Sequence, residues 1–383
     1  MMKTITVKDL GDVITGNTPP RSKPELYGDY TPFIKATDIS ETSKYTYEPE
    51  ECYSEEGHKK YRNSLIPKGA TCVVTIGSVG KKMTMAHCDC FINQAMNAII
   101  PNENYDKEYV YYLLKHNVHK LKMLNSGTAS GRENVSKSAF SNMELLVVQD
   151  IAVQKKIGSI LSDFDRLIEN NQNQINLLEE AAQRLYKEWF VDLRFPGYEG
   201  TEIVDGVPEG WKKHHIDDVF HIKYGKTLPT SKITKEGKYP VYGANGVIGF
   251  YLEKNVDDYV VLITSRGNGS GDVLRTHDKE SFVTNNSFIV KPYDHSIRLP
   301  FIHQLMKNTD FKNICTGSAQ PQLTNNSIST LLVLLPSCEL ISQFCDIESS
   351  WYEKIEMLLT QNRLLSQARD RLLPKLMNGE IEV

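Results

Sequence analysis

The chain of 383 residues lacks any apolar run long enough to cross a membrane, because a spanning helix needs about 20 mostly apolar residues. Its first 13 residues carry charges where a signal peptide has its apolar segment. We therefore expect a globular protein of the cytoplasm that makes no membrane contact.

Cysteine is scarce and irregularly placed. The chain has seven cysteines, an odd number, and a protein of this size does not need disulfides for stability. Cys88 and Cys90 follow His87, but a zinc site needs about four ligands and no second cluster at suitable spacing supplies the others. Reduced thiols and no bound metal are expected.

Motifs for catalysis are also missing. A DNA methyltransferase should carry an Asn/Asp-Pro-Pro-aromatic segment to hold a flipped adenine, together with a glycine-rich cofactor loop. Residues 18–21, Thr-Pro-Pro-Arg, lack the amide or carboxylate and the aromatic ring. Gly225-Lys226-Thr227 resembles the end of a phosphate-binding loop, but Phe220 stands where the required earlier glycine belongs. We expect no catalytic residue and no cofactor bound by this chain.

The chain has no overall excess of positive charge, since its formal net charge is −4. Residues 1–149 hold 18 Lys and Arg against 17 Asp and Glu, and residues 205–337 hold 15 against 13. The acidic excess lies in residues 150–204, with 6 against 10, and in residues 338–383, with 5 against 8. Phosphate contact rewards local positive charge, so the two less acidic segments are the expected surface for a nucleic acid.

An internal repeat organises the chain into two halves. Three pairs of segments correspond, namely 73–77 with 262–267, 93–95 with 285–287, and 126–129 with 316–319. An alternation of apolar and polar residues follows the last pair in each half. Such period-two runs predict strands with one buried face.

After each globular segment the apolar period changes from two to about three and a half, which is typical of a coiled-coil seam. The first seam comprises Ile157, Leu161, Phe164, Ile168, Asn171, Ile175, Leu178, Ala182, Leu185 and Trp189. The second comprises Trp351, Ile355, Leu358, Asn362, Leu365, Arg369, Leu372 and Leu376. We expect two long helices packed on each other, with Pro374 and Gly379 closing the second. The alternative is that each helix packs on its own globular domain.

The predicted fold class is α/β (α+β), with two pseudo-repeated domains at opposite ends of an antiparallel pair of long coiled-coil helices. Antiparallel packing is expected because a tandem repeat closed by a pseudo-twofold returns the second helix alongside the first. A stretch rich in Pro and Gly between the halves predicts a linker. The expected order is a domain at 1–149, a central helix at 150–190, the linker at 191–204, a domain at 205–337 and a distal helix at 338–378.

Four motifs, in order along this repeat, make the whole chain resemble the specificity subunits of type I restriction enzymes. They are the helix end at 183–190, Val-Pro-Glu-Gly-Trp at 207–211, Gly-Ser-Ala-Gln-Pro-Gln-Leu at 317–323, and Arg-Leu-Leu-Pro-Lys-Leu at 371–376. The first half departs from the second at 129–132, Ala-Ser-Gly-Arg.

The resemblance implies a non-catalytic subunit of a type I site-specific deoxyribonuclease and adenine-N6 methyltransferase complex. Each globular domain is then a target-recognition domain for one half of a bipartite target in double-stranded DNA. The helices set the spacing and dock two methyltransferase subunits, and two restriction and translocase subunits join them. S-adenosylmethionine, Mg²⁺ and ATP are expected on those partners. The competing interpretation is a coiled-coil adaptor that binds protein and no DNA.

DNA recognition needs Arg, Lys, Asn, Gln, Ser and Thr side chains on loops, where they reach base edges or phosphates. In the first half the candidates are Asn17, Arg21, Lys23, Lys35, Thr75, Ser78, Lys81, Lys82, Thr128, Ser130 and Arg132. In the second half they are Lys226, Thr227, Asn245, Ser265, Arg266, Asn268, Ser270, Ser318, Gln320 and Gln322.

Two further pairs of residues have candidate roles on the helices. Asn171 and Asn362 occupy otherwise apolar seam positions that should face each other, and a buried Asn in a seam fixes register at some cost in stability. The alternative is that each amide bonds to water. Trp189 and Phe190, near one helix end, are candidates for contact with the methyltransferase subunits, and their alternative role is packing against the adjacent domain.

Overall fold

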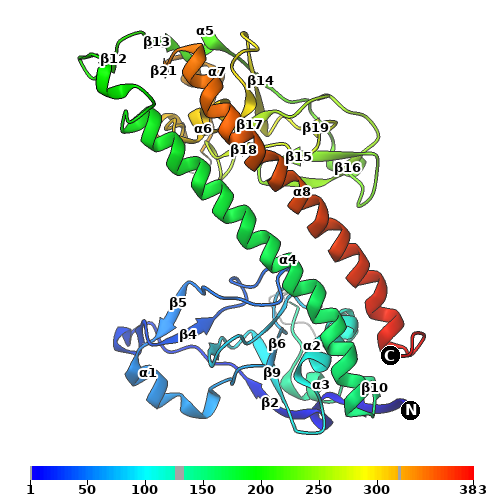
Figure 1. Ribbon diagram of the computed structural model, residues 1–383. Coiled ribbons are helices and arrows are strands. Elements are labelled where there is room, and N and C mark those ends of the chain that lie inside the picture. The colour runs from blue at the N-terminus through cyan, green and yellow to red at the C-terminus, as the bar shows by residue number, and fades with distance from the viewer. Residues whose placement is uncertain (1, 126–132, 318–320) are drawn as a thin grey trace. The chain divides into compact units, whose positions relative to one another are not determined.

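The computed structural model describes residues 2–125, 133–317 and 321–383. The chain divides into two compact units, the first made of Met1–Asn171 and Thr360–Val383 and the second of Gln172–Leu359. The long helices α4 (Ile151–Tyr186) and α8 (Cys338–Met377) each contribute to both units (Figure 1). Within the described ranges no helix combines the length and the apolar character that a membrane span requires.

The first unit is built from antiparallel strands with one parallel pair. Its strands are β1 (Met2–Thr6), β2 (Gly11–Thr15), β3 (Tyr27–Gly28), β4 (Thr31–Ile34), β5 (Glu51–Tyr53), β6 (Thr71–Val74), β7 (Met83–Met85), β8 (Phe91–Ile92), β9 (Met96–Pro101) and β10 (Glu144–Val148). One sheet has the order β2-β9-β6-β7, another the order β3-β5-β4-β8, and β1 pairs with β10. Strands β4 and β8 are parallel. The short helices are α1 (Glu55–Lys60), α2 (Lys107–Asn117) and α3 (Lys137–Ser141).

The second unit has a closely related plan. Its strands are β11 (Ile203–Val204), β12 (Val207–Pro208), β13 (Lys212–His215), β14 (Phe220–Tyr224), β15 (Tyr239–Gly243), β16 (Gly246–Tyr251), β17 (Val261–Thr264), β18 (Val273–Arg275), β19 (Phe282–Val283), β20 (Ser287–Pro292) and β21 (Leu332–Leu335). The sheets have the orders β14-β20-β17-β18 and β16-β15-β19, β13 pairs with β21, and β11 pairs with β12. The short helices are α5 (Ile216–Val219), α6 (Leu299–Lys307) and α7 (Asn325–Ser329).

The two plans confirm the predicted repeat and the mixed helix and strand class. The order β2-β9-β6-β7 in the first unit matches β14-β20-β17-β18 in the second, and each unit has one parallel pair, β4 with β8 and β15 with β19. The segments that correspond in sequence, 73–77 and 262–267, run from the matching strands β6 and β17 into the loops that follow.

The sheet β2-β9-β6-β7 is buried on both faces, as its strand β6 shows, since successive side chains of a strand point to opposite sides. In β6, Val73 joins the core that contains the helix residue Ile157. Its neighbour Cys72 joins a second core with Ile34 of β4. Helices therefore cover one face of this sheet, and the sheet β3-β5-β4-β8 covers the other.

Helices α4 and α8 run antiparallel in each unit. In the first unit Asp165 pairs with Arg369, whereas Asn171, further along α4, donates a hydrogen bond to Asn362, which lies earlier in α8. In the second unit Ile175 clusters with Ile355 and Leu358, whereas the ring centroid of Tyr186, further along α4, lies 5.9 Å from that of Phe344, which lies earlier in α8. The expected antiparallel pair and the expected contact between the two asparagines are thus confirmed.

Two details of the helix ends differ from the expectation. Pro374 lies inside α8, which continues to Met377 before Gly379 adopts a φ of +71°. The helix passes the proline because Leu376 and Met377 are held in the core of the first unit. At the other helix, α4 is followed by a π-helical turn, Lys187–Val191.

Candidate nucleic-acid interface

Backbone hydrogen bonds hold several loops of the second unit together beside the sheet β14-β20-β17-β18. The loop after β14 meets the end of β19 and the loop that follows it, because Lys226 N donates to Val283 O over 3.0 Å and Asn285 N donates to Lys226 O over 3.2 Å. The loop after β17 meets the same segment through Ser265 N, which donates to Asn286 O over 2.8 Å. These loops therefore form one continuous structure.

The chain segment before α7 completes this arrangement. Leu323 N donates to Ser265 O over 2.9 Å, and Gly267 N donates to Pro321 O over 3.1 Å. We call these loops and their backbone bonds the loop framework. The turn after β15 joins it, because Thr264 Oγ1 donates to Ala244 O over 2.7 Å. The exposed candidates that it brings together are Lys226, Thr227, Asn245, Arg266 and Asn268, and Gln322 is half-buried.

The first unit has a matching loop framework. Thr75 N donates to Ala95 O over 2.8 Å, Val135 N donates to Thr75 O over 2.8 Å, and Gly77 N donates to Glu133 O over 2.9 Å. These bonds correspond, one for one, to those of Ser265, Leu323 and Gly267 in the second unit. The two halves therefore share the backbone hydrogen bonds that support the loops, whereas the exposed side chains on those loops differ.

Three predicted recognition residues are buried and are removed from the candidate set. Thr75, Ser265 and Ser270 expose 1%, 0% and 4% of their surface, too little to reach a base or a phosphate. The Thr75 hydroxyl accepts from Asn97 Nδ2 over 2.8 Å, and the Ser265 hydroxyl donates to Asn285 O over 3.3 Å. Both directly follow a buried strand, so their hydroxyls face the loop framework and help to hold it.

Other candidates in the first unit are engaged with acidic partners. Arg21 Nη2 lies 2.8 Å from Glu51 Oε1, and Lys35 pairs with both Glu50 and Glu51. The hydrogen bond from Arg21, followed by the charge of Lys35, lowers the pKa of Glu51. Arg21 and Lys35 must exchange these carboxylates for phosphates if they are to contact DNA.

The remaining candidates of the first unit differ in their exposure and in whether their side chains already form hydrogen bonds. Asn17 is tied down, because its Nδ2 donates to Ser64 Oγ over 2.8 Å. Lys82 is half-buried, with Nζ donating to Ala36 O over 3.4 Å. Lys23, Ser78 and Lys81 are exposed. The predicted residues Thr128, Ser130, Arg132, Ser318 and Gln320 lie outside the described residues.

Gln94, Asn285 and Asn286 were not predicted, although they lie in the loop framework. Gln94 is exposed, and Asn285 and Asn286 are half-buried. The strand registers match Met96 with Ser287 and hence Gln94 with Asn285, one residue away from the correspondence of 93–95 with 285–287 in the sequence. Both segments carry amides, which base recognition uses. That repeated placement was the signal available in the sequence.

Trp189 and Phe190 belong to the core of the second unit, contrary to their predicted role as an exposed contact. They expose 7% and 8% of their surface. The Phe190 ring centroid lies 5.1 Å from that of Phe344 and 5.2 Å from that of Phe301. The alternative role, packing against the adjacent domain, is the one observed.

The sequence His87-Cys88-Asp89-Cys90 does not assemble a metal centre in the described ranges. Cys88 Sγ lies 3.3 Å from His87 Nε2, whereas Cys90 is buried. Within the parts of the chain that the structure describes, no group of three or more His, Cys, Asp or Glu side chains is arranged to hold a metal ion.

Comparison with known proteins identifies the family. The family model for the type I restriction modification DNA specificity domain matches residues 1–180 and 208–347. The chain is 26% identical to the type I restriction enzyme MjaIX specificity subunit of Methanocaldococcus jannaschii, covering 98% of this chain and 93% of that protein. It is 32% identical to the HindI specificity subunit of Haemophilus influenzae over 45% of this chain and 38% of that protein.

A solved structure has the same fold. The crystal structure of a type I restriction-modification S subunit from M. genitalium superposes with a TM-score of 0.62 at 20% identity, covering 98% of this chain and 96% of that one. The family model matches well over half of the chain, in both repeats. The chain therefore belongs to the type I restriction-modification DNA specificity family, and its role is that of a specificity subunit.

Proposed function

We propose that this chain recognises a bipartite target in double-stranded DNA, with the loop framework of each unit reading one half. The recurrence of the same backbone bonds around Thr75 and Ser265 is the observation that carries this proposal. A fixed backbone with variable exposed Lys, Arg, Asn and Gln suits sequence readout, because phosphate contacts position a protein and base contacts specify the site.

In this proposal the catalytic reactions take place on partner subunits. Two methyltransferase subunits hold S-adenosylmethionine and methylate adenine, and two restriction and translocase subunits use ATP and Mg²⁺. Membership of the specificity family supports this division of labour. The helices set the distance between the half-targets and provide the surface on which the methyltransferase subunits dock.

Exposed apolar side chains on the helices are the docking candidates that replace Trp189 and Phe190. Leu167 of α4 and Leu364 of α8 expose 51% and 57% of their surface in the first unit. Leu177 and Met357 expose 64% and 45% in the second unit. Replacing Leu177 by Glu should weaken methyltransferase binding in a titration, and replacing the exposed Gln172 of the same helix by Glu serves as the matched control.

Mapping of N6-methyladenine in cells with and without this chain tests the proposal. We expect one bipartite sequence to lose methylation when the chain is absent and to regain it when the chain is restored. Filter binding of the reconstituted complex should show an affinity that falls steeply with salt, because cations released from phosphates drive binding. A complex that binds DNA weakly and without salt dependence would favour the coiled-coil adaptor.

A further inference from the structure

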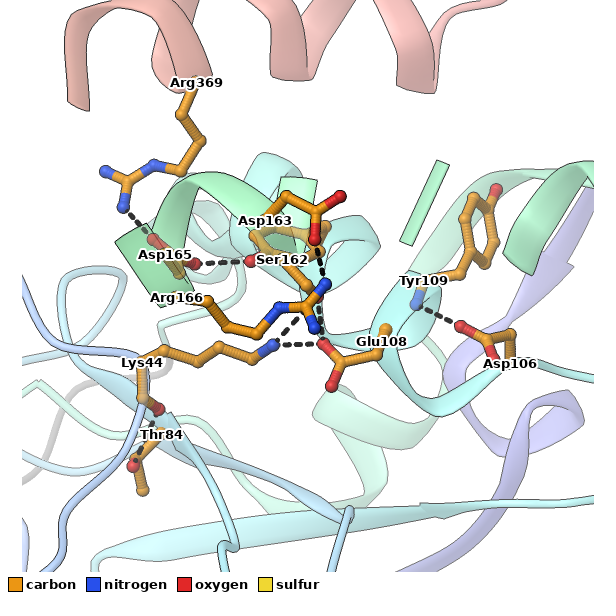
Figure 2. A network of polar contacts seen from close by, with 11 residues as sticks. Lys44, Thr84, Asp106, Glu108, Tyr109, Ser162, Asp163, Asp165, Arg166 and Arg369 are labelled. Carbon is orange, nitrogen blue, oxygen red and sulfur yellow. Dashed lines mark hydrogen bonds and ion pairs between the residues drawn. The ribbon is translucent and has the colours of Figure 1, made fainter. Parts of the chain in front are cut away.

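A buried charged group connects the first globular domain to α4. The Lys44 side chain is 4% exposed and pairs with Glu108 of α2. Lys44 Nζ also donates to Ser162 Oγ of α4 over 3.1 Å, and Ser162 donates in turn to Glu108 over 2.5 Å. Figure 2 shows these three side chains pointing toward one another between the domain and the helix.

A second buried pair continues from α4 to α8 within the same unit. Asp165, one turn after Ser162, pairs with Arg369 of α8, and the two side chains are 10% and 7% exposed (Figure 2). Tyr112 of α2 donates its hydroxyl to the other oxygen of Asp165. We call Lys44, Glu108, Ser162, Asp165 and Arg369 the anchor network.

The buried charges of the anchor network are better suited to fixing the orientation of the domain on the helices than to stabilising the fold. Burying two charges costs hydration free energy, and an apolar pair of similar volume often stabilises a protein equally well or better. Apolar contacts allow one surface to slide on another, whereas charge-assisted hydrogen bonds need a fixed distance and direction. A domain held to both helices by such bonds has one preferred angle on them.

The second unit is anchored by a different set of residues. Arg275 of β18 pairs with Glu356 of α8, and its guanidinium lies 4.2 Å from the ring centroid of Tyr352. In the repeat, Tyr352 occupies the position of Asp165, as Leu358 occupies that of Asn171. Each unit therefore has its own anchor, and a change to Asp165 acts on the first unit alone.

We propose that the anchor network is a positioning element, which fixes the angle of the first recognition domain on the helices and so restricts the spacing between half-targets that the complex accepts. This inference rests on the proposed function. Asp165 and Arg369 are positioning residues in this scheme, because they act on DNA only through the domain that they orient.

The test replaces the ion pair by an apolar pair, D165L with R369M, in the full complex with its methyltransferase subunits. The double variant removes both charges together, although Tyr112 loses its acceptor, so we expect its melting temperature to fall less than that of D165L alone. We also expect methylation at targets one base pair longer or shorter to rise by about tenfold relative to the natural target. The half-target sequences themselves should not change.

Two further measurements keep the proposal falsifiable. R166Q removes the exposed pair of Arg166 with Asp163 on the same helix, and it should leave the spacing preference unchanged. If D165L with R369M lowers the melting temperature sharply, D165N alone is assayed at a temperature where it is folded. A folded variant with wild-type spacing preference overturns the positioning role. If the wild-type complex methylates no bipartite target at all, the proposed function is overturned instead.

Discussion

The Asn171 side-chain amide donates a hydrogen bond of 3.0 Å to the side-chain oxygen of Asn362, within the apolar seam of α4 and α8. Asn171 is 7% exposed, so its amide cannot turn fully to water. A slip by one heptad would break this bond and leave a buried amide unpaired. The pair thus opposes the kind of slip that would change a distance measured by the helices.

Replacing both asparagines by leucine tests this role in register. We expect the double variant to be as stable as the wild type or more so, because both polar partners are removed together. Asn171→Leu alone should lose about 1 kcal/mol, since it leaves Asn362 without its partner. Thermal melts of the three variants give the coupling between the sites, and methylation mapping should reveal targets with altered spacing only for the double variant.

Arg266 lies at the start of the loop that follows β17, exposed and beside Gln322 across a β-bridge. We expect Arg266→Ala to weaken binding by about 1–3 kcal/mol if the side chain reads a base. The loss should appear only on targets that contain the half-site read by the second unit, and competition filter binding can measure it. Lys212→Ala on β13 removes an exposed cation outside the loop framework and is the control. An equal loss on every sequence would identify a phosphate contact instead.

The sequence predicted the features that depend on local burial patterns. The heptad seam located α4 and α8 and placed Asn171 opposite Asn362, because helical period is a property of neighbouring residues. The sequence did not show that Thr75 and Ser265 are buried instead of exposed to DNA, since the hydroxyl of a residue that follows a strand can face the core or the solvent. Arg369 was placed in the second seam, but its partner Asp165 lies beside the first seam and far away in the chain, so the sequence did not identify this pair.

Phe190 is expected to stabilise the second unit rather than to bind a partner. Phe190→Ala should lower the free energy of unfolding by about 3–5 kcal/mol, because the ring is lost from a packed aromatic cluster. All three tryptophans, at 189, 211 and 351, lie in the second unit, so their fluorescence reports its unfolding. The exposed neighbour Val191 is the control, and Val191→Ala should change little. Weaker methyltransferase binding by folded Phe190→Ala would restore the contact role.

Gly158 of α4 allows α2 to approach closely. A β-carbon there would lie 2.8 Å from Asp106 Oδ1 and 2.9 Å from the backbone nitrogen of Tyr109. Alanine favours a helix by about 1 kcal/mol over glycine, but displacing the capped start of α2 should outweigh this gain. We expect Gly158→Ala to destabilise the first unit by about 1–3 kcal/mol.

Hydrogen exchange of the α2 amides measures the effect of Gly158→Ala on the first unit. The exposed Ser159 on the same helix provides the contrast, since Ser159→Ala should gain a few tenths of a kcal/mol from helix propensity. If both alanine variants protect the α2 amides equally well, the close approach at Gly158 does not constrain the packing.

Glu348 of α8 makes the second unit sensitive to alkaline pH. The residue is 0% exposed, and neither carboxyl oxygen has a hydrogen-bond partner among the described residues. Burial raises the pKa of Glu348 to about 9, and the nearby charges of Arg275 and Lys307 only partly oppose this shift. Between the ordinary pKa of a glutamate and pH 9, the folded protein therefore keeps a proton that the unfolded chain has lost.

The sign of the resulting pH dependence follows from that proton. Because the folded state binds more protons, stability is highest in mild acid and falls as the pH rises toward 9, by at most about 1.4 kcal/mol per pH unit. Glu348→Gln should remove this slope and raise the denaturation midpoint at pH 8, as followed by tryptophan fluorescence. Glu353→Gln changes an exposed carboxylate on the same helix and should leave the slope intact. A Glu348→Gln variant with the wild-type slope would show that Glu348 is ionised in the folded protein.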